Sequence, residues 1–405
     1  MTIGNGGSHL GAALEGLKVL EIAQLVAGPM AGSFMADLGA DVVHLEDPST
    51  GDPHRRVGAA RDGVHLWWKV AARNKRSATC DLRSADGQEL ARSLAGWADV
   101  VVTNFRAGTL ERWGLDWDRL HAVNPTLVML AVSGYGADTS RRDEPGFGKV
   151  GEAMSGVVHL TGFADGPPLH AGYSNADSLT GLMGAFAVQA ALFRRAHDPG
   201  FAGELIDLAL FEPHYRMVEW QVIVQDQTGE TPGRSGNSLP GFAGGVVNAF
   251  PAADGQYLTV SAGTPRSAVT LADMVGEPMD LDAPDAALAA TSVRIEEKLA
   301  AWIAARSADD ALSTLAAKDV VASKIYTTAD ILADPTYAER GDVIEVDDPD
   351  LGSVKMQAVI PRLRHHGGRV WRSGPALGAD NELVYRQFLG LTAERFAELQ
   401  RAGTI

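Results

Sequence analysis

The feature that most constrains this chain is a regular alternation of short β-rich runs with helix-like segments between Leu17 and Ser133. Runs such as "LKVLEIA", "ADVVHLE", "ADVVVTNF" and "TLVMLAVSG" are separated by helical segments such as "GPMAGSFMADLG" and "ADGQELARSLAGW". This alternation is typical of βαβ units, in which the strands are parallel and the crossovers right-handed. The sequence therefore predicts an α/β fold with a large, doubly wound, Rossmann-like and mostly parallel sheet.

Ligands of such a sheet bind beyond the carboxyl ends of its strands. The segments that follow the predicted strands are therefore the first places to look for a site. They are residues 24–29, 46–56, 104–112 and 133–147.

The 405 residues exceed the size at which one hydrophobic core keeps growing, so more than one domain is expected. The character of the chain changes where Gly and Pro cluster in "TPGRSGNSLPGFAGG", ahead of a predicted hairpin and further helices. We expect a flexible leader over residues 1–16, a large domain built from 17–229 and 326–405, and a smaller α+β domain over 230–325.

The composition excludes several classes of protein. A formal net charge of −16 argues against general binding to nucleic acid or an anionic membrane. The longest apolar runs fall short of the about 18 residues of a membrane span, and the N-terminus lacks the features of a secretory signal, so we expect a cytoplasmic protein. The single cysteine, Cys80, excludes an intrachain disulfide and a cysteine-cluster metal site, and we expect it to be buried.

Basic residues gather in the first third of this acidic chain. An anionic ligand would need such a local cluster to overcome the overall charge, whereas ordinary solvated surface charge is the alternative. The members are Arg55, Arg56, Arg61, Lys69, Arg73, Lys75, Arg76, Arg106 and Arg112.

Familiar cofactor motifs are missing or incomplete. The turn "AGPMAGS" has glycines only at Gly28 and Gly32, so the G-x-G-x-x-G spacing of dinucleotide sites is absent, and Glu46 alone is a weak ribose ligand. A Rossmann-type dinucleotide-dependent oxidoreductase remains a remote alternative, and we expect no nicotinamide. The pair His365-His366 has no acid at ligand spacing and no G-x-S-x-G motif occurs, so neither a metal site nor a serine triad is predicted.

A single acid, Asp177, lies in the stretch "GYSNADSLTGLMGAFAVQAALFRRA", just ahead of residues that read as one buried helix. Asp commonly caps a helix by accepting hydrogen bonds from its first N–H groups, and Ser174, Asn175 and Ser178 are also eligible. Within this window a cap is the more frequent use of a carboxylate, and a nucleophile is the alternative.

Five ordered blocks of the chain resemble the family III CoA-transferases, the group that includes formyl-CoA transferase and the carnitine CoA-transferase. The agreement runs from about residue 15 to 200 and continues more weakly to the end. The blocks are "GLKVLEIAQLVAGPMAGSFMADLGADVVHLEDPSTGDPHRR", "NKRSATCDL", "ADVVVTNFRAGTLERWGL", "SGYGADTSRRDEPGFGKVGEAMSGVVHLTGFADGPP" and the Asp177 segment.

The resemblance implies a role for Asp177, which opens the D-x-x-x-G segment together with Gly181. In this family that carboxylate attacks the thioester of an acyl-CoA donor to form an anhydride. CoA thiolate then forms an aspartyl-CoA thioester, and an acceptor carboxylic acid repeats the exchange. Coenzyme A thus enters as part of a substrate, without a metal, and the family likeness also implies an interlocked homodimer.

The resemblance further assigns contacts with CoA to four parts of the chain and a glycine-rich covering loop to Gly244 and Gly245. Among these residues, Lys75, Arg106 and Arg112 carry the charge that phosphates would attract. The predicted CoA-binding residues are Val26, Ala27, Ala72, Arg73, Asn74, Lys75, Asn104, Phe105, Arg106, Arg112, Pro145, Gly146, Phe147 and Gly148.

Two departures from the family pattern bear on the reaction. The Lys, Tyr and Glu of formyl-CoA transferase are absent from "PGFG", and Phe147 and Met154 suggest an acid bulkier than formate. An acyl-CoA α-proton racemase or isomerase of the same superfamily is the main alternative. That chemistry needs a His where this chain has Phe147, which cannot transfer a proton.

Overall fold

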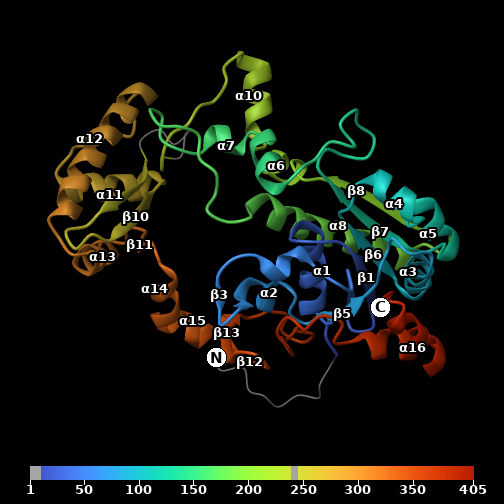
Figure 1. The fold of residues 1–405 in the computed structure, drawn as a ribbon. Helices are drawn as coiled ribbons and strands as arrows, with labels where there is room; N and C mark the ends of the chain where they lie inside the picture. Colours follow the sequence, from blue (N-terminus) through green and yellow to red (C-terminus); the bar gives the residue numbers. More distant parts are fainter. Residues whose placement is uncertain (1–10, 239–244) are drawn as a thin grey trace. The chain divides into compact units, whose positions relative to one another are not determined.

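The computed structural model of the chain describes residues 11–238 and 245–405. It divides into two compact units (Figure 1). The larger consists of the described residues up to 157 together with 170–222 and 338–405; the smaller consists of 158–169 and the described part of 223–337. The expected small domain, 230–325, is thus extended at both ends, and 158–169 joins it although no change in composition marks that segment.

Six strands form the main sheet of the larger unit, in the order β5-β2-β1-β6-β7-β8, and every neighbouring pair is parallel. Numbered by their sequence among these six, the strands run 3-2-1-4-5-6, which is the Rossmann order. The predicted α/β class with a doubly wound parallel sheet is confirmed. The bounds are β1 (Lys18–Ile22), β2 (Asp41–Glu46), β5 (Arg76–Thr79), β6 (Val100–Thr103), β7 (Val128–Ser133) and β8 (Glu204–Ala209).

Helices cover both faces of this sheet (Figure 1). Helices α1 and α8 contribute to the core on one face, and α3, α5 and the C-terminal α16 contribute to the core on the other. The helices of this unit are α1 (Ala27–Asp37), α2 (Leu66–Ala71), α3 (Ala85–Trp97), α4 (Ala107–Trp113), α5 (Trp117–Val123), α6 (Gly148–Met154), α8 (Asn175–His197), α9 (Glu212–Met217) and α16 (Ala393–Arg401), with the 3-10 helix η1 (Pro53–Arg56) and the π-helix η2 (Leu383–Phe388).

Two short hairpins and three helices complete this part of the chain and its borders with the smaller unit. The hairpins are β3 (Ala60–Arg61) with β4 (Val64–His65), and β12 (Val343–Asp348) with β13 (Gly352–Gln357). The helices that span the borders are α7 (Val157–Leu160), α10 (Trp220–Thr228) and α15 (Pro335–Arg340).

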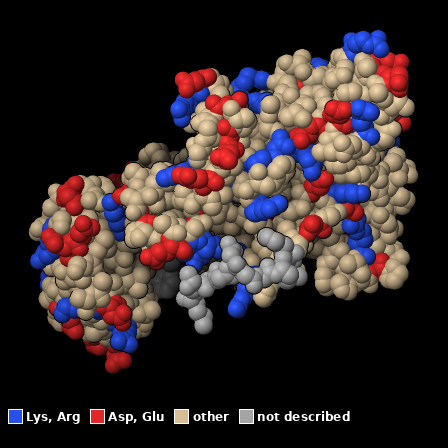
Figure 2. All heavy atoms as spheres, turned by 90° about the horizontal axis from the view of Figure 1, so that it is seen from below, with Lys and Arg blue, Asp and Glu red and all other residues tan. Residues whose placement is uncertain are grey.

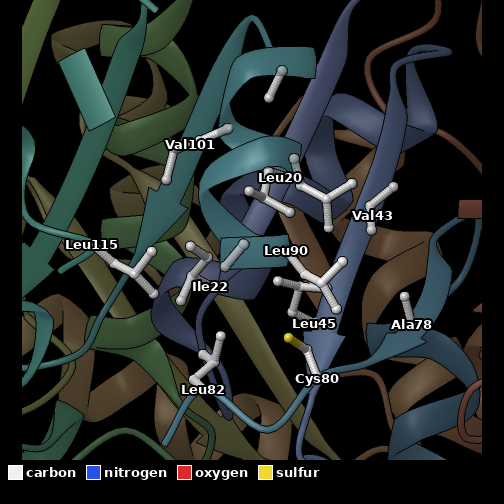
Figure 3. Packing of buried hydrophobic residues seen from close by; sticks show 14 of the residues in the cluster. Leu20, Ile22, Val43, Leu45, Ala78, Cys80, Leu82, Leu90, Val101 and Leu115 are labelled. Atoms are coloured by element: carbon white, nitrogen blue, oxygen red, sulfur yellow. The ribbon is translucent and has the colours of Figure 1, made fainter. Parts of the chain in front are cut away.

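The central strands are buried on both faces because helices cover both, which explains their continuous apolar runs. Leu20 of β1, Val43 of β2 and Leu90 of α3 belong to one core cluster (Figure 3). Full burial of each such side chain stabilises the fold by roughly 1.5–3 kcal/mol. Cys80 lies in the same cluster and is only 2% exposed, as its sequence context predicted.

The segment "GTLERWGLDWDRLHAV" forms two helices, α4 and α5. Gly114 ends α4 with a left-handed φ of 65°, which favours glycine. Asp116 then begins α5 by accepting a hydrogen bond from the backbone N–H of Arg119. The break follows from a C-terminal glycine and a new N-cap only two residues apart.

The described part of the predicted leader is held in place. The backbone N–H of Ala13 donates to the carbonyl of His366, and that of Leu14 donates to the carbonyl of Leu38. Residues 1–10 lie outside the described residues.

The smaller unit is an α+β structure around an antiparallel sheet in the order β11-β10-β9. Its core joins Val260 of β10 with Leu271 and Leu299 from the helices. Gly245 directly precedes β9, whereas Gly244 lies outside the described residues. The bounds are β9 (Val246–Pro251), β10 (Tyr257–Ala262), β11 (Ala322–Lys324), α11 (Pro265–Val275), α12 (Asp285–Ala304), α13 (Ala308–Ala317) and α14 (Thr328–Ala333).

Helix α8 is long and apolar enough to cross a membrane by length and composition alone. Its buried residues, among them Ala185 and Val188, instead share a core with Ala31 of α1 and Leu130 of β7. These contacts are those of a helix in the core of the larger unit.

Candidate active site

A cavity of about 530 Å³ opens in the larger unit at the carboxyl edge of the sheet. It is lined from the segments after β1, β6 and β7, beside the point where the strand order reverses and Rossmann sheets bind their ligands. The lining residues are Gln24, Leu25, Val26, Ala27, Val57, Trp67, Asn104, Phe105, Arg106, Thr109, Val132, Ser133, Gly134, Arg142, Glu144, Gly146, Phe147, Ser174, Asp177 and Leu210.

The structure brings part of the predicted site together around this cavity. The predicted residues that line it are Val26, Ala27, Asn104, Phe105, Arg106, Gly146, Phe147 and Asp177. Those outside its lining are Ala72, Arg73, Asn74, Lys75, Arg112, Pro145 and Gly148.

Asp177 is the third residue of α8 and lies in its first turn. Ser174 precedes the helix, and neither side chain caps it; in the described part of the chain, the Asp177 carboxylate has no hydrogen bond or ion pair. Burial raises the pKa of Asp177 to about 6, the negative charge of Glu152 adds to this shift, and Lys149 opposes it. At neutral pH the carboxylate is therefore mainly the anion, and it has no partner among the described residues.

Two glycines allow the surroundings of Asp177 to pack closely. A Cβ on Gly148, the first residue of α6, would lie 2.3 Å from Oδ2 of Asp177. A Cβ on Gly181 would lie 2.5 Å from the Cβ of Met30, so the glycine of the D-x-x-x-G motif lets α8 approach α1. Gly148 therefore approaches the carboxylate of Asp177 itself, although it lies outside the cavity lining.

The turn between β1 and α1 forms one wall of the cavity and is held at several points. Leu25 adopts a left-handed φ of 62°, which is rare for a residue with a side chain. Its backbone N–H donates to both carboxylate oxygens of Asp52, at 3.0 and 3.2 Å, and its carbonyl accepts from Nδ1 of His54 at 2.9 Å. Asn104 exchanges two hydrogen bonds with the backbone of Gln24.

Asp52 and His54 escaped the sequence analysis. Asp52 caps the short 3-10 helix η1 and His54 lies within it, and the only signal in the sequence was their position after the second predicted strand, within residues 46–56. Their partner Leu25 carries no mark in the sequence of its unusual backbone.

A buried ionic cluster supports this turn from within the sheet. His44 places Nδ1 2.7 Å from Glu21 and Nε2 3.1 Å from Asp52. Burial would lower the pKa of His44, but the hydrogen bonds and charges of Asp52 and Glu21 outweigh it and raise the pKa to about 9. The ring is therefore an imidazolium at neutral pH that donates to two carboxylates.

Lys75 belongs to the same cluster. It is 1% exposed, and its ammonium donates to both oxygens of Glu21, at 2.9 and 3.0 Å, and to the carbonyl of Pro29. Protein acceptors occupy this ammonium, in place of the free phosphate ligand that the family resemblance implies. A buried cation of this kind holds the first turn of α1 against the sheet.

Arg73 and Asn74 are occupied in a similar way, since both donate to the carboxylate of Asp37. Ala72 is buried behind α2. Arg112 lines a separate surface depression with Arg92 and donates to the hydroxyl of Thr109.

Two arginines face the cavity. The guanidinium of Arg106 has no hydrogen bond or ion pair within the described residues, although the backbone carbonyl of this residue accepts from the N–H groups of Thr109 and Leu110. Arg142 donates to Glu111 at 2.8 Å, while its Nε is buried with no hydrogen-bond acceptor among the described residues. Figure 2 shows acidic and basic side chains interspersed over the face that it draws.

The alternative chemistries find little support in the cavity. Phe147 is 65% exposed at the start of α6, and its ring has no group that could accept or donate a proton. Among residues 11–238 and 245–405, no cluster of His, Cys, Asp and Glu has the geometry of a metal site.

Comparison with known proteins points to one family. A model of the family described as CoA-transferase family III matches residues 14–381. The chain is 40% identical over 394 residues to the succinyl-CoA–D-citramalate CoA-transferase of Chloroflexus aurantiacus, covering 96% of both chains. It is 32% identical to the succinyl-CoA–L-malate CoA-transferase beta subunit of the same organism, again covering 96% of both.

A solved structure agrees with these sequence relationships. The CaiB/BaiF family protein from Brucella suis superimposes with a TM-score of 0.81 at 31% identity. The match covers 94% of this chain and all of that protein.

Proposed function

Since the chain belongs to CoA-transferase family III, and its general function is CoA transfer, we propose that the transfer passes through covalent intermediates on the carboxylate of Asp177. The observation that carries this proposal is an ionised carboxylate, without a partner in the described part of the chain, in the first turn of a helix at the edge of the cavity. Such a group needs no general base, and the helix N-terminus favours the anion.

The proposed reaction begins when an oxygen of Asp177 attacks the thioester carbonyl of the donor. The carbon–sulfur bond breaks, CoA leaves as a thiolate, and a mixed anhydride forms. The thiolate then attacks the aspartyl carbonyl, which releases the donor acid and leaves an aspartyl-CoA thioester. The acceptor carboxylate attacks that thioester, whose carbon–sulfur bond breaks to release CoA thiolate again and leave a second anhydride. The thiolate finally attacks the acceptor's acyl carbon, which yields the new acyl-CoA and restores Asp177.

The proposed substrates are succinyl-CoA as donor and a short dicarboxylic acid as acceptor. The relatives are described as acting on succinyl-CoA with citramalate or malate, both of which carry a second carboxylate. Arg142 supports this choice, because its guanidinium lines the cavity and its Nε, 3.8 Å from Oδ2 of Asp143, has no hydrogen-bond acceptor among the described residues; a guanidinium of this kind suits a distal carboxylate. Arg106 is then the cation for CoA, as the family resemblance implies.

We also propose a homodimer that acts in the cytoplasm. Large apolar side chains support the dimer: Leu182, Phe186 and Phe193 of α8 are 51%, 69% and 68% exposed in the single chain. A run of apolar side chains along one helix is more than a monomer ordinarily leaves in water.

The direct test is to trap the intermediate. The protein is incubated with succinyl-CoA without an acceptor and then treated with hydroxylamine or borohydride. Peptide mass analysis should find the modification at Asp177, and Asp177→Asn should carry none while still binding CoA. An unmodified protein that exchanges the α-protons of succinyl-CoA with solvent deuterium would overturn the proposal in favour of an isomerase.

The same preparation tests the substrate class. Succinate, malate, citramalate and glutarate should accept CoA at least tenfold faster than butyrate at equal concentration, since only the diacids offer a second carboxylate to a cation. Equal rates with butyrate would contradict the dicarboxylate proposal without affecting the covalent one.

A further inference from the structure

Helix α6 places two opposite charges beside the segment that leads into Asp177. Glu152 is 2% exposed, and its Oε1 accepts from the backbone N–H of Ala171 at 2.9 Å. Its Oε2 lies 3.0 Å from Nζ of Lys149 and 3.0 Å from Nδ1 of His170. Burial favours the neutral form of Glu152, but the bonds from Ala171, Lys149 and His170 outweigh it and lower its pKa, so it is a buried anion.

Lys149 binds the carbonyl groups of the segment that leads into α8. Its Nζ donates to the carbonyl of Ala171 at 2.6 Å and to that of Tyr173 at 3.4 Å. Glu152 and Lys149 thus hold both the N–H and the carbonyl of Ala171, one turn before α8 begins. Gly148, on the same helix, lies so close to the Asp177 carboxylate that a Cβ would have no room there.

From this geometry we propose that Glu152 and Lys149 are paired positioning residues for Asp177: together they fix the backbone that enters α8, and their charges act on its carboxylate with opposite sign. The inference rests on the proposed function, in which Asp177 is the nucleophile. Glu152 makes the carboxylate more basic and hence more nucleophilic, whereas Lys149 limits that effect so that the anion persists at neutral pH.

Several elements that pack against α8 or line the cavity carry charged and titratable groups. Those whose charges act on the Asp177 carboxylate are Glu152, which raises its pKa, and Lys149, which lowers it. The remaining groups on the packed elements and the cavity wall are Asp37 of α1, Glu204 and Asp207 of β8, Glu212, His214, Tyr215 and Arg216 of α9, and Arg106, Arg142, Glu144, His170 and Tyr173 nearby. Burial lowers the pKa of His214, which keeps that ring neutral.

The test measures the Asp177 pKa directly in the resting protein. Aspartate labelled with carbon-13 at the carboxyl is titrated by NMR, and Asp177→Asn identifies the signal. Glu152→Gln keeps an acceptor for Ala171 but removes the charge, so the pKa should fall by about one unit. Lys149→Met should raise it, and the acid limb of kcat/KM should move in the same direction in each variant.

Matched variants separate this effect from simple loss of structure. Glu89→Gln removes an equal charge from the exposed side of α3. Helix α3 packs on the face of the sheet opposite to α8, so this variant should leave the pKa of Asp177 unchanged. If Glu152→Gln does not fold, Lys149→Met still tests the predicted sign. His170→Gln should leave the Asp177 pKa in place; a shift equal to that of Glu152→Gln would assign the effect to the imidazole and overturn the proposal.

The two proposals can fail separately. Unchanged or same-direction shifts in Glu152→Gln and Lys149→Met would overturn the opposed-charge inference even if the trapped adduct forms on Asp177. Shifts of the Asp177 pKa in opposite directions, without any adduct on Asp177, would support the opposed charges of Glu152 and Lys149 but contradict the proposal that Asp177 is the nucleophile.

Discussion

The proposed chemistry of Asp177 depends on its burial and on the lack of hydrogen-bond partners for its carboxylate among the described residues. The group lies in the first turn of α8 without a hydrogen-bond partner in the described chain, and burial raises its pKa to about 6. A more basic carboxylate is a better nucleophile, but it is protonated at a higher pH than an ordinary aspartate. Transfer should therefore decline as the pH drops through about 6, because protonation removes the attacking anion.

Substitution of Gly148 tests whether the reaction needs the space beside the Asp177 carboxylate. An Ala Cβ would lie 2.3 Å from Oδ2 of Asp177, so Gly148→Ala must displace the carboxylate that we propose as the nucleophile. We expect kcat to fall on the order of 100-fold, as for a misplacement of about 1 Å, with little loss of stability because Ala favours a helix. Steady-state kinetics and thermal unfolding measure the two effects.

Gly172→Ala is the matched control for this change. It lies a few residues before α8, and its added Cβ would meet no atom within 4 Å. Its kcat should stay within about twofold of the parent. A Gly148→Ala variant as active as Gly172→Ala would show that the close approach has no role in the reaction.

At the scale of elements, the cavity wall depends on the β1–α1 turn and the loop that clamps it. Asp52 and His54 hold the N–H and carbonyl of Leu25 in a left-handed backbone conformation. The same Asp52 lies against the His44 imidazolium, which links the turn to Glu21 within the sheet. The shape of the wall is therefore coupled to a buried ionic cluster.

This coupling predicts a pH-dependent contribution of Asp52 to stability. The pKa of His44 rises from 6.5 to about 9 on folding, so its ionic contribution is complete below pH 6.5 and is lost as the pH rises through 9. Asp52→Asn should reduce the free energy of unfolding by about 1–3 kcal/mol at pH 6 and by less at pH 9.5. Urea unfolding at both pH values measures the difference.

Asp62→Asn serves as the surface control, since Asp62 is highly exposed and pairs only loosely with Arg61. It should change stability by less than about 0.5 kcal/mol at either pH. An Asp52→Asn cost that is the same at pH 6 and 9.5 would show that His44 is not charged in the folded protein.

At the scale of the whole molecule, the exposed apolar face of α8 leads to a prediction about assembly. The chain has a mass of 42.8 kDa, and a homodimer should elute with twice that mass in light-scattering chromatography. Phe186→Ser combined with Phe193→Ser should shift the mass toward the monomer, because each loses apolar burial at the proposed interface.

Phe163→Ser provides the comparison, since Phe163 is 59% exposed but belongs to the smaller unit. It should leave the mass unchanged. A monomeric parent protein at micromolar concentration would contradict the homodimer proposal.

The sequence by itself determined the α/β class, the parallel sheet and three of the segments that line the cavity, 24–29, 104–112 and 133–147. These follow from local patterns: β-rich runs alternate with helices, and parallel strands bring their carboxyl ends to one edge. It also indicated Asp177 at the start of a helix, because a polar residue ahead of a long apolar run is a local signal.

Only the tertiary structure decided which partners the charged side chains have. Lys75 and Arg73 read as free cations, yet Glu21 and Asp37 neutralise them from positions 54 and 36 residues away. Likewise, nothing in the local sequence marks Glu152 as a neighbour of Asp177 or Leu25 as a left-handed residue. Burial and pairing depend on which distant elements pack together, so the role of each charged side chain is fixed by the fold.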